Sequence, residues 1–226
     1  MALLVAIEGI DGSGKGTQAA RLQQSLENAG RTAALISFPR YDRTAFGQRI
    51  GEFLNGRFGK LDEVNPYLVS LLYAGDRFES KQVLLDAMEN HEVVIIDRYV
   101  PSNIAHQGAK LPLDDRDDII RWIEQVEYDI YALPRPDLVI LLDLPAESAQ
   151  TLIAKKSART YTDQAADLHE ADLQYLINVR GLYRELADRH HAWRMVRVEV
   201  EGTIRSIEEV GHEVHDHVFT QLMRSP

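Results

Sequence analysis

The sequence contains no cysteine among its 226 residues. Disulfide bonds, zinc sites built from thiolates and a cysteine nucleophile are therefore excluded, and the composition fits a reducing, cytoplasmic location. No apolar run approaches the length needed to cross a membrane. The short run at the N-terminus lacks a basic flank and meets Glu8 at once, so we expect a core strand there and no targeting signal.

The chain also lacks an excess of positive charge. Its formal net charge is −10 at pH 7, from 25 Lys and Arg against 35 Asp and Glu. Nucleic-acid binding needs a broad basic face, so we expect no nucleic acid as a partner. A small polyphosphate needs only a local arginine cluster, and the acidic total does not exclude one. No Gly-x-Ser-x-Gly elbow supports a serine hydrolase.

Nothing in the sequence marks a second domain, because internal repeats, low-complexity tracts and linkers rich in Pro, Gly or Ser are all missing. The length suits one α/β domain with an ample core. The hydrophobic content of 45% and the charged content of 27% are ordinary for a globular protein. We therefore expect residues 1–226 to form a single domain.

The loop after the N-terminal strand carries the strongest local signal. An aliphatic run over residues 3–8 is followed by Gly9-Ile10-Asp11-Gly12-Ser13-Gly14-Lys15-Gly16-Thr17, and residues 18–28 have helical character. Strand, glycine-rich loop and helix in this order predict a phosphate-binding loop over residues 9–17. Its backbone N–H groups would surround an anion at a helix N-terminus, and Lys15 would add a cation over the phosphates. A chance glycine cluster is the alternative.

One position departs from the usual form of this loop. A Ser or Thr that ligates magnesium normally follows the lysine, whereas this chain has Gly16 and then Thr17, an order like that of adenylate kinases. The departure favours water-mediated metal binding over direct ligation by the Thr17 hydroxyl.

Strand and helix patterns alternate along the whole chain. Apolar runs predict five strands, over residues 3–8, 32–38, 93–96, 138–144 and 195–200. Helical patterns lie between and after them, over residues 18–28, 44–54, 65–90, 102–107, 115–132, 148–154 and 172–190, and from Ser206 onwards. This alternation predicts a three-layer α/β/α fold of the P-loop NTPase type, with a five-stranded parallel sheet and helices on both faces.

Right-handed crossovers place the carboxyl ends of parallel strands at one edge, where ligands bind. Asp97 is expected there to orient Mg²⁺ or its waters, although capping of the next helix is an alternative. Arg40 and Arg98 lie on loops at the same edge and suit bidentate binding of phosphate. For Arg40, a surface ion pair is the alternative.

The segment from about 155 to 169 loses periodicity and carries Lys155, Lys156 and Arg159. We interpret it as a mobile lid whose cations would stabilise the charge of a phosphoryl-transfer transition state and exclude water. An ordinary solvated loop is the alternative. The acidic cluster at residues 114–118 is assigned to the solvated first turn of a helix, and a metal site at His212, His215 and His217 is not expected.

Four further motifs follow the first loop: Phe38-Pro39-Arg40-Tyr41, Gly75-Asp76-Arg77, Asp97-Arg98-Tyr99 followed by Ser102-Asn103, and Asp167-Leu168-His169-Glu170. Over nearly the whole chain, the set resembles thymidylate (dTMP) kinases. The resemblance implies transfer of the ATP γ-phosphate to dTMP, giving dTDP and ADP for dTTP biosynthesis. It also implies Mg²⁺ as cofactor and a homodimer.

The resemblance also implies roles for individual residues. The ATP phosphates would be held by Gly12, Ser13, Gly14, Lys15, Gly16 and Thr17. The metal would be organised by Thr17, Asp97 and Asp11, partly through water. The catalytic groups would be Lys15, Arg98, Asp11 and Arg159, the last as a cation on the transition state.

On the acceptor side, Arg98 would bind the dTMP phosphate with help from Asp11, Arg40 and Tyr41. The nucleoside would be contacted by Arg77 at the thymine edge, Tyr73 on the ring, Ser102 and Asn103 beside the base, Tyr99 under the deoxyribose and Glu170 near the 3′-hydroxyl.

Alternatives remain for several of these residues. Tyr73 lies on an apolar helix and could belong to the core, and Arg77 could pair with Glu79 or Asp76. His106 replaces a frequent aromatic near the 2′ position of the sugar. For the whole protein, the alternatives are another nucleoside-monophosphate kinase or a nucleotide-dependent switch. A switch would need no acceptor site, so the phosphate-binding arginines Arg40 and Arg98 argue against it.

Overall fold

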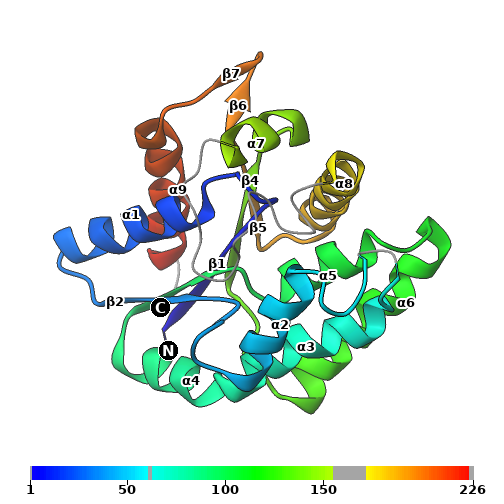
Figure 1. Cartoon of the computed structure of the whole chain (residues 1–226). Helices are drawn as coiled ribbons and strands as arrows, with labels where there is room; N and C mark the ends of the chain where they lie inside the picture. The colour runs from blue at the N-terminus through cyan, green and yellow to red at the C-terminus, as the bar shows by residue number, and fades with distance from the viewer. Residues whose placement is uncertain (1, 61–62, 155–171, 224–226) are drawn as a thin grey trace.

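The computed structural model describes residues 2–60, 63–154 and 172–223 (Figure 1). Its centre is a five-stranded parallel sheet with the order β2-β3-β1-β4-β5. The strands are β1 (Leu3–Glu8), β2 (Ala33–Ser37), β3 (Val93–Asp97), β4 (Leu138–Asp143) and β5 (Trp193–Arg197). The predicted fold class is confirmed.

The register aligns the carboxyl ends of the central strands. In β1 and β3, Leu3 lies opposite Val93 and Ile7 lies opposite Asp97. In β1 and β4, Glu8 lies opposite Leu141. The loops that follow β1 and β3 therefore leave the sheet at one edge, as the sequence predicts for parallel strands.

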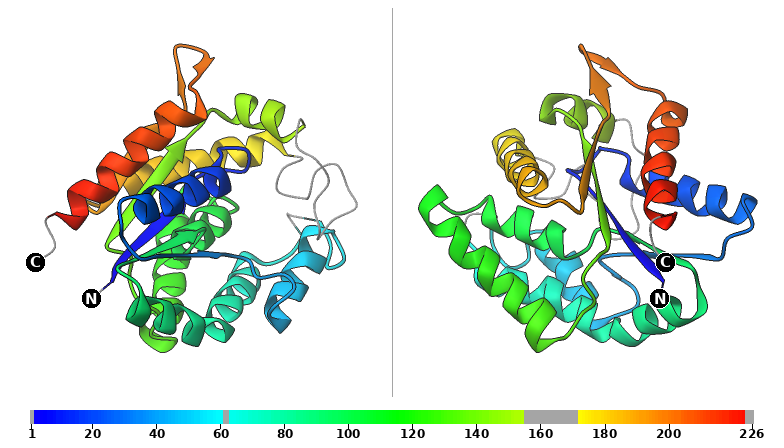
Figure 2. Two further views of the ribbon diagram at one scale, coloured as in Figure 1. Left: turned by 90° about the vertical axis from the view of Figure 1, so that its left-hand side faces the viewer. Right: turned by 180° about the vertical axis from the view of Figure 1, so that it is seen from behind.

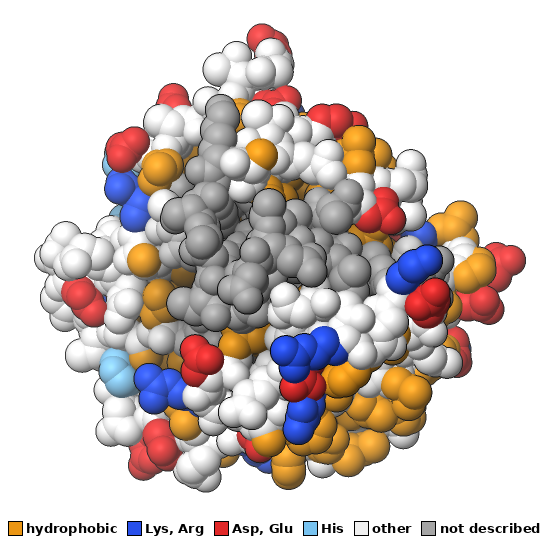
Figure 3. Space-filling view, viewed as in Figure 1, with side chains coloured by type: hydrophobic (Ala, Val, Ile, Leu, Met, Phe, Trp, Pro, Cys, Tyr) orange, Lys and Arg blue, Asp and Glu red, His pale blue; other side chains and the backbone are white. Residues whose placement is uncertain are grey.

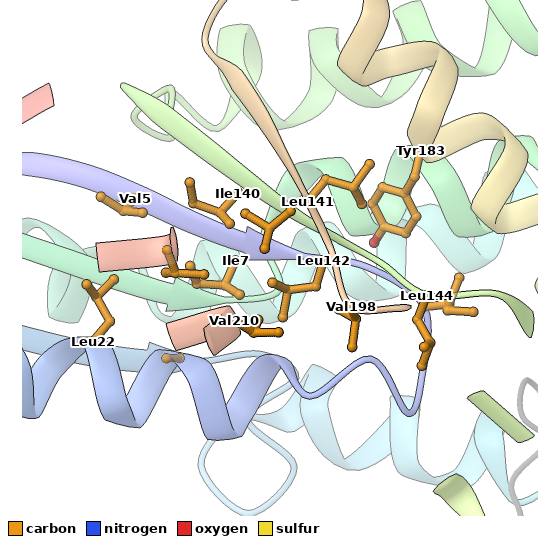
Figure 4. Packing of buried hydrophobic residues seen from close by; sticks show 14 of the residues in the cluster. Val5, Ile7, Leu22, Ile140, Leu141, Leu142, Leu144, Tyr183, Val198 and Val210 are labelled. Carbon is orange, nitrogen blue, oxygen red and sulfur yellow. The ribbon is translucent and has the colours of Figure 1, made fainter. Parts of the chain in front are cut away.

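Helices cover both faces of the sheet because side chains along a buried strand alternate between two cores. Val5 and Ile7 belong to one hydrophobic cluster, which includes residues of α1 (Lys15–Asn28) and α9 (Ile207–Leu222). Figure 4 shows Leu22 of α1 and Val210 of α9 on this side of the sheet. Leu4 and Ala6 belong to the other cluster, with residues of α4 (Lys81–Asn90), α5 (Val100–Gly108), α6 (Leu113–Glu124) and α8 (Leu173–Arg189). The two views in Figure 2 show α1 and α9 packed side by side on the first face.

The other helices are α2 (Ala45–Leu54), α3 (Pro66–Glu79), α4 (Lys81–Asn90), α5 (Val100–Gly108), α6 (Leu113–Glu124), the π-helix η1 (Gln125–Ile130), α7 (Ala146–Ile153) and α8 (Leu173–Arg189). Side-chain caps are present at α3 and α9. The Asn65 side chain accepts from Tyr67 N ahead of Pro66, and Ser206 and Glu209 form a capping box. Within the described ranges, no helix is long and apolar enough to span a bilayer.

The predicted helix over residues 65–90 is wrong in one respect, since the structure contains two helices there. Ser80 separates α3 from α4 with φ −93° and ψ 0°, and its hydroxyl accepts a hydrogen bond from the Arg40 guanidinium. A break of one residue leaves the apolar periodicity almost unchanged, so the sequence pattern does not reveal it.

Two other predicted elements end earlier than expected. The helix predicted over residues 115–132 is α6 followed by η1, in which the helical turn widens. The strand predicted over residues 195–200 ends at Arg197, and a hairpin of β6 (Glu199–Val200) and β7 (Thr203–Ile204) follows. Its turn residues, Glu201 and Gly202, both have positive φ, as a tight hairpin requires.

Candidate active site

The loop between β1 and α1 is packed closely against β4 and α7. A Cβ atom added to Gly9 would lie 2.6 Å from the Leu142 carbonyl oxygen, and one added to Gly12 would lie 2.7 Å from that of Ala149. Both glycines have positive φ, 141° and 83° respectively. Only glycine satisfies both conditions, so the sequence spacing specifies this loop shape.

The loop leaves polar groups directed at its own interior. Lys15 is buried, and its Nζ donates to the Ile10 carbonyl oxygen at 2.8 Å, across the loop. The N-cap of α1 is Gly14, whose lack of a side chain leaves the first N–H groups of the helix without a side-chain cap. The Ser13 hydroxyl is buried and has no hydrogen-bond partner among the described residues. This arrangement suits a bound phosphate.

The electrostatic environment of Lys15 supports the same interpretation. The pKa of Lys15 is lowered to about 8, first by burial and then by the charge of Arg98, whereas Asp11 and Asp97 oppose the shift. Two cations thus influence each other at one site. An incoming polyphosphate would offset this repulsion.

Arg98 connects β3 to the phosphate loop. Its backbone has φ 68°, unusual for a residue with a side chain, and its N–H donates to the Ile7 carbonyl oxygen. Its guanidinium pairs through Nη2 with the Asp11 carboxylate and lies 3.4 Å from Ser102 Oγ. The structure therefore brings Lys15, Asp11 and Arg98 together, as the sequence predicts.

A buried carboxylate that sequence analysis assigned only to a core strand supports this region. Glu8 accepts hydrogen bonds from Tyr99 N at 2.7 Å, Ser102 Oγ at 2.6 Å and Tyr183 Oη at 2.8 Å. Burial raises the pKa of Glu8, and the same donors oppose the shift. The available signal was an acidic residue at the end of an otherwise apolar strand, since such a buried group needs partners.

Two predicted nucleoside contacts have side chains directed elsewhere. The Tyr99 ring is fully buried and its hydroxyl donates to the Pro134 carbonyl oxygen, so it packs in the core and not under a sugar. The Ser102 hydroxyl is held by Glu8 and Tyr183, on the Arg98 side of the site. Glu8 therefore accounts for the position of the Ser102 hydroxyl, whereas it accepts only the backbone N–H of Tyr99.

His106, which replaces the expected aromatic, joins the network of Arg98. Its Nε2 lies 3.3 Å from Arg98 Nη1 and its Nδ1 lies 3.0 Å from the Tyr175 hydroxyl. Because the guanidinium can only donate, Nε2 accepts, and Nδ1 carries the proton.

Arg40 and Tyr41 follow β2 and lie beside α2 and α3. The Arg40 N–H donates to Asp76 Oδ2 at 3.0 Å, and its guanidinium donates to Ser80 Oγ at 3.2 Å. Tyr41 and Tyr73 are partly buried against a small apolar cluster of α2 and α3. The N–H and the guanidinium of Arg40 thus donate to Asp76 of α3 and to Ser80, whereas the Arg98 guanidinium contacts the phosphate loop and α5.

Arg77 pairs with neither of the acids that the sequence suggested. Its Nε and Nη2 donate to Glu127 of η1 at 2.5 and 2.7 Å, and both side chains are almost completely buried. Burial alone would lower the pKa of Arg77, but the Glu127 carboxylate more than offsets this effect and the pKa is raised. Asn103 donates to the same carboxylate at 2.8 Å. Glu127 lies 50 residues from Arg77, so local sequence patterns did not reveal it.

The residues predicted for a metal fit Mg²⁺ in part. A Cβ atom added to Gly16 would lie 3.2 Å from Asp97 Oδ2, so this carboxylate lies against the start of α1. Thr17 is exposed on α1. Over the ranges that the structure describes, no group of three or more His, Cys, Asp or Glu could hold a metal ion, and this includes the histidines of α9. Hard carboxylate oxygens beside a phosphate loop suit Mg²⁺ bound partly through water. Arg159, Glu170 and the segment 155–169 lie outside the described residues.

The phosphate loop lies at the carboxyl edge of a parallel sheet, Arg98 pairs with it, and α5 connects Arg98 to a second polar group formed by Asn103, Glu127 and Arg77. These features define a P-loop nucleotide kinase. The thymidylate kinase family model matches residues 7–210, and the chain belongs to this family. It is accordingly an enzyme that phosphorylates dTMP to dTDP, with ATP as the phosphate donor.

Known relatives agree over almost the full length. A thymidylate kinase of Mycobacterium tuberculosis is 32% identical over 201 residues, which is 88% of this chain and 93% of that protein. A probable thymidylate kinase of Thermococcus gammatolerans is 34% identical over 228 residues, 99% of both chains. The structure of thymidylate kinase from Candida albicans matches with a TM-score of 0.76 and 25% identity, covering 97% of this chain and 92% of that one.

Proposed function

We propose that the chain transfers the ATP γ-phosphate to dTMP between the loop Gly12–Thr17 and Arg98. The observation that carries this proposal is the ion pair between Arg98 and Asp11, which connects the loop after β3 to the phosphate loop. Two phosphate groups bound by these two loops would face each other. The single domain 1–226 and the use of the product for dTTP biosynthesis are part of the same proposal.

In this mechanism, positioning and charge stabilisation supply the rate. Backbone N–H groups of the loop and Lys15 hold the donor phosphates, and Arg98 holds the acceptor phosphate. An acceptor phosphate oxygen is already anionic, so no general base is required. Arg159 is proposed as the cation that stabilises the transition state.

On the acceptor side, Arg77 and Asn103 are proposed to bind the thymine edge, with Tyr73 against the ring. Arg40 and Tyr41 are proposed to support the acceptor phosphate, with Ser102 acting through Arg98 and Glu170 near the sugar 3′-hydroxyl. The buried pairing of Arg77 supports the first part, because a guanidinium held rigidly presents its remaining N–H groups in a defined direction.

We propose Mg²⁺ as the cofactor. Asp97 and Asp11 would hold it through water, with Thr17 nearby, in agreement with the position of Asp97 against the start of α1. When bound, the ion would neutralise charge on the donor phosphates.

We also propose a homodimer. Leu68 of α3, Leu113 of α6 and Ile130 of η1 are exposed by 63%, 71% and 63%, and these three elements pack against one another. Figure 3 shows hydrophobic side chains gathered at the lower right of the face in view. A second copy of this chain would cover such side chains.

The test of the proposed function is an assay of ADP release with ATP and Mg²⁺, with and without dTMP. We expect ADP to form rapidly only when dTMP is present, and more slowly with dUMP, AMP or CMP. ADP formation that does not depend on dTMP would contradict the proposal and favour the nucleotide-dependent switch.

A further inference from the structure

Glu127 is the central residue of a buried polar cluster that also contains Arg77 and Asn103. It lies in η1, the π-helix that follows α6, and its side chain is completely buried. Its carboxylate accepts from Arg77 Nε and Nη2 and from Asn103 Nδ2. One residue therefore holds side chains from two different helices, α3 and α5. A π-helix widens the turn and alters side-chain direction, and such turns are frequent at functional sites.

The contacts of Asn103 define the direction of its amide group. Nδ2 donates to Glu127 Oε1 at 2.8 Å and to the Ser70 carbonyl oxygen at 3.0 Å. Both partners can only accept while the carboxylate is ionised, so the amide nitrogen must face them and a flipped amide would lose both bonds. The Asn103 oxygen, Oδ1, points away from them and is buried without a hydrogen-bond partner among the described residues.

The cluster therefore offers a ligand one acceptor and one donor. The acceptor is Asn103 Oδ1, and the donor is Arg77 Nη1, the guanidinium nitrogen that Glu127 does not engage. Thymine and uracil present a donor at N3 and an acceptor at O4, which complement this pair. Cytosine presents an acceptor at N3 and a donor at its 4-amino group, which oppose it. A buried acceptor such as Asn103 Oδ1 costs free energy when the bound base gives it no donor. The site therefore disfavours cytosine as well as favouring thymine and uracil.

We propose that Glu127 is a positioning residue that sets the base specificity of the acceptor site. By accepting from both Asn103 and Arg77, it orients their remaining polar atoms to bind 4-keto pyrimidines and to reject cytosine. This inference rests on the proposed function, in which Arg77 and Asn103 bind the base, and adds the residue that orients them.

The test is Glu127→Gln, assayed with dTMP, dUMP and dCMP. The new amide can donate to Asn103, which allows the Asn103 amide to flip and to present its nitrogen to the base. We expect the ratio of kcat/KM for dTMP to that for dCMP to fall by at least about tenfold. The dTMP to dUMP ratio should not change, because the two bases share the same N3 and O4 groups. The KM for ATP should also stay the same.

The matched control is Glu124→Gln, the same change three residues earlier, where the side chain is half-exposed and pairs with Arg135. We expect it to leave all ratios unchanged. If Glu127→Gln lowers activity equally with dTMP and dCMP, Glu127 has a structural role only and the proposal is wrong. If the wild-type protein does not phosphorylate dTMP at all, the proposed function itself is contradicted.

Glu127→Gln leaves Arg77 buried without an anion, which destabilises the fold. A second measurement therefore uses the wild-type protein and covers the case in which this variant does not fold. Wild-type protein is saturated with dTMP labelled with ¹⁵N at N3, and the N3 imino proton is followed by NMR. We expect it to be protected from solvent exchange and to lose protection in Asn103→Ala. An imino proton that exchanges as fast as in free dTMP would overturn the assigned amide direction.

Discussion

At the residue scale, the site depends on buried and partly buried charges that are paired across long sequence separations. Arg77 pairs with Glu127, Arg98 with Asp11, and Glu8 with three donors from other elements. An unpaired charge in these positions would be strongly destabilising, so each partner is required by its neighbour. The result is a set of side chains with defined directions before substrate binds.

Arg98 should contribute to the binding of the acceptor phosphate in the transition state. We expect Arg98→Ala to lower kcat/KM for dTMP by the equivalent of about 2–4 kcal/mol, with a smaller effect on the KM for ATP. Steady-state kinetics with each substrate varied in turn measure this. Arg31→Ala, which removes an exposed ion pair with Glu92, is the control and should retain wild-type rates. Wild-type kinetics in Arg98→Ala would refute the assigned role.

Lys110 allows a test of pH dependence outside the catalytic groups. Its ammonium donates to Gln107 Oε1 and lies 5.1 Å from the centroid of the Phe53 ring, and burial lowers its pKa to about 7. In the unfolded chain, Lys110 keeps its proton up to a pH near 10.5. The buried ammonium therefore destabilises the folded state at low pH, and the free energy of unfolding rises as the pH increases from 7 to 10.5.

We therefore expect Lys110→Met to stabilise the protein relative to wild type most at pH 6, by about 1–2 kcal/mol. This difference should shrink as the pH rises from 7 towards 10.5. Urea denaturation of both proteins across this range gives the free energies of unfolding. A difference that does not vary with pH would contradict the lowered pKa.

At the element scale, α2 is held close to the segment that carries Arg40 by a glycine on its first turn. A Cβ atom added to Gly47 would lie 2.4 Å from the Arg40 carbonyl oxygen, which is backbone and cannot move aside alone. One turn later, a Cβ atom added to Gly51 would only touch the Tyr41 ring at 3.6 Å. The two positions therefore differ in packing while sharing a helix.

We expect Gly47→Ala to destabilise the protein by about 1–3 kcal/mol and to raise the KM for dTMP, because the Arg40 segment must shift. Gly51→Ala should be neutral or stabilising by up to about 1 kcal/mol, since alanine favours a helix interior over glycine. Thermal unfolding and dTMP kinetics of both variants compare them. Equal stability of the two variants would show that α2 can move without cost.

At the scale of the whole molecule, exposed apolar side chains on α3, α6 and η1 predict self-association. We expect the wild-type chain to sediment at about twice its 25.6 kDa mass at micromolar concentration. The double change Leu68→Glu with Leu113→Glu should give monomers, because it buries two charges in the proposed interface. The double change Ile204→Glu with Ile207→Glu, exposed on β7 and α9, should leave the dimer intact. A monomeric wild-type chain would refute the homodimer.

The sequence by itself determined the parallel α/β/α fold and the phosphate loop. Aliphatic runs that alternate with helical patterns leave few topologies, and the glycines of the first loop are required by positive φ and close packing. Residue patterns report only the local environment, so they assign Glu8 to a core strand and do not indicate the role of Glu127.

Only the tertiary structure decided how the side chains pair. Which carboxylate meets Arg77, and whether Tyr99 faces the site or the core, depends on how crossovers bring α3, α5 and η1 together. The hydrogen bonds of Glu127 join positions that lie 24 and 50 residues apart. The energy of such a buried pair exists only after the chain has folded, so the periodicity of either segment contains no trace of it.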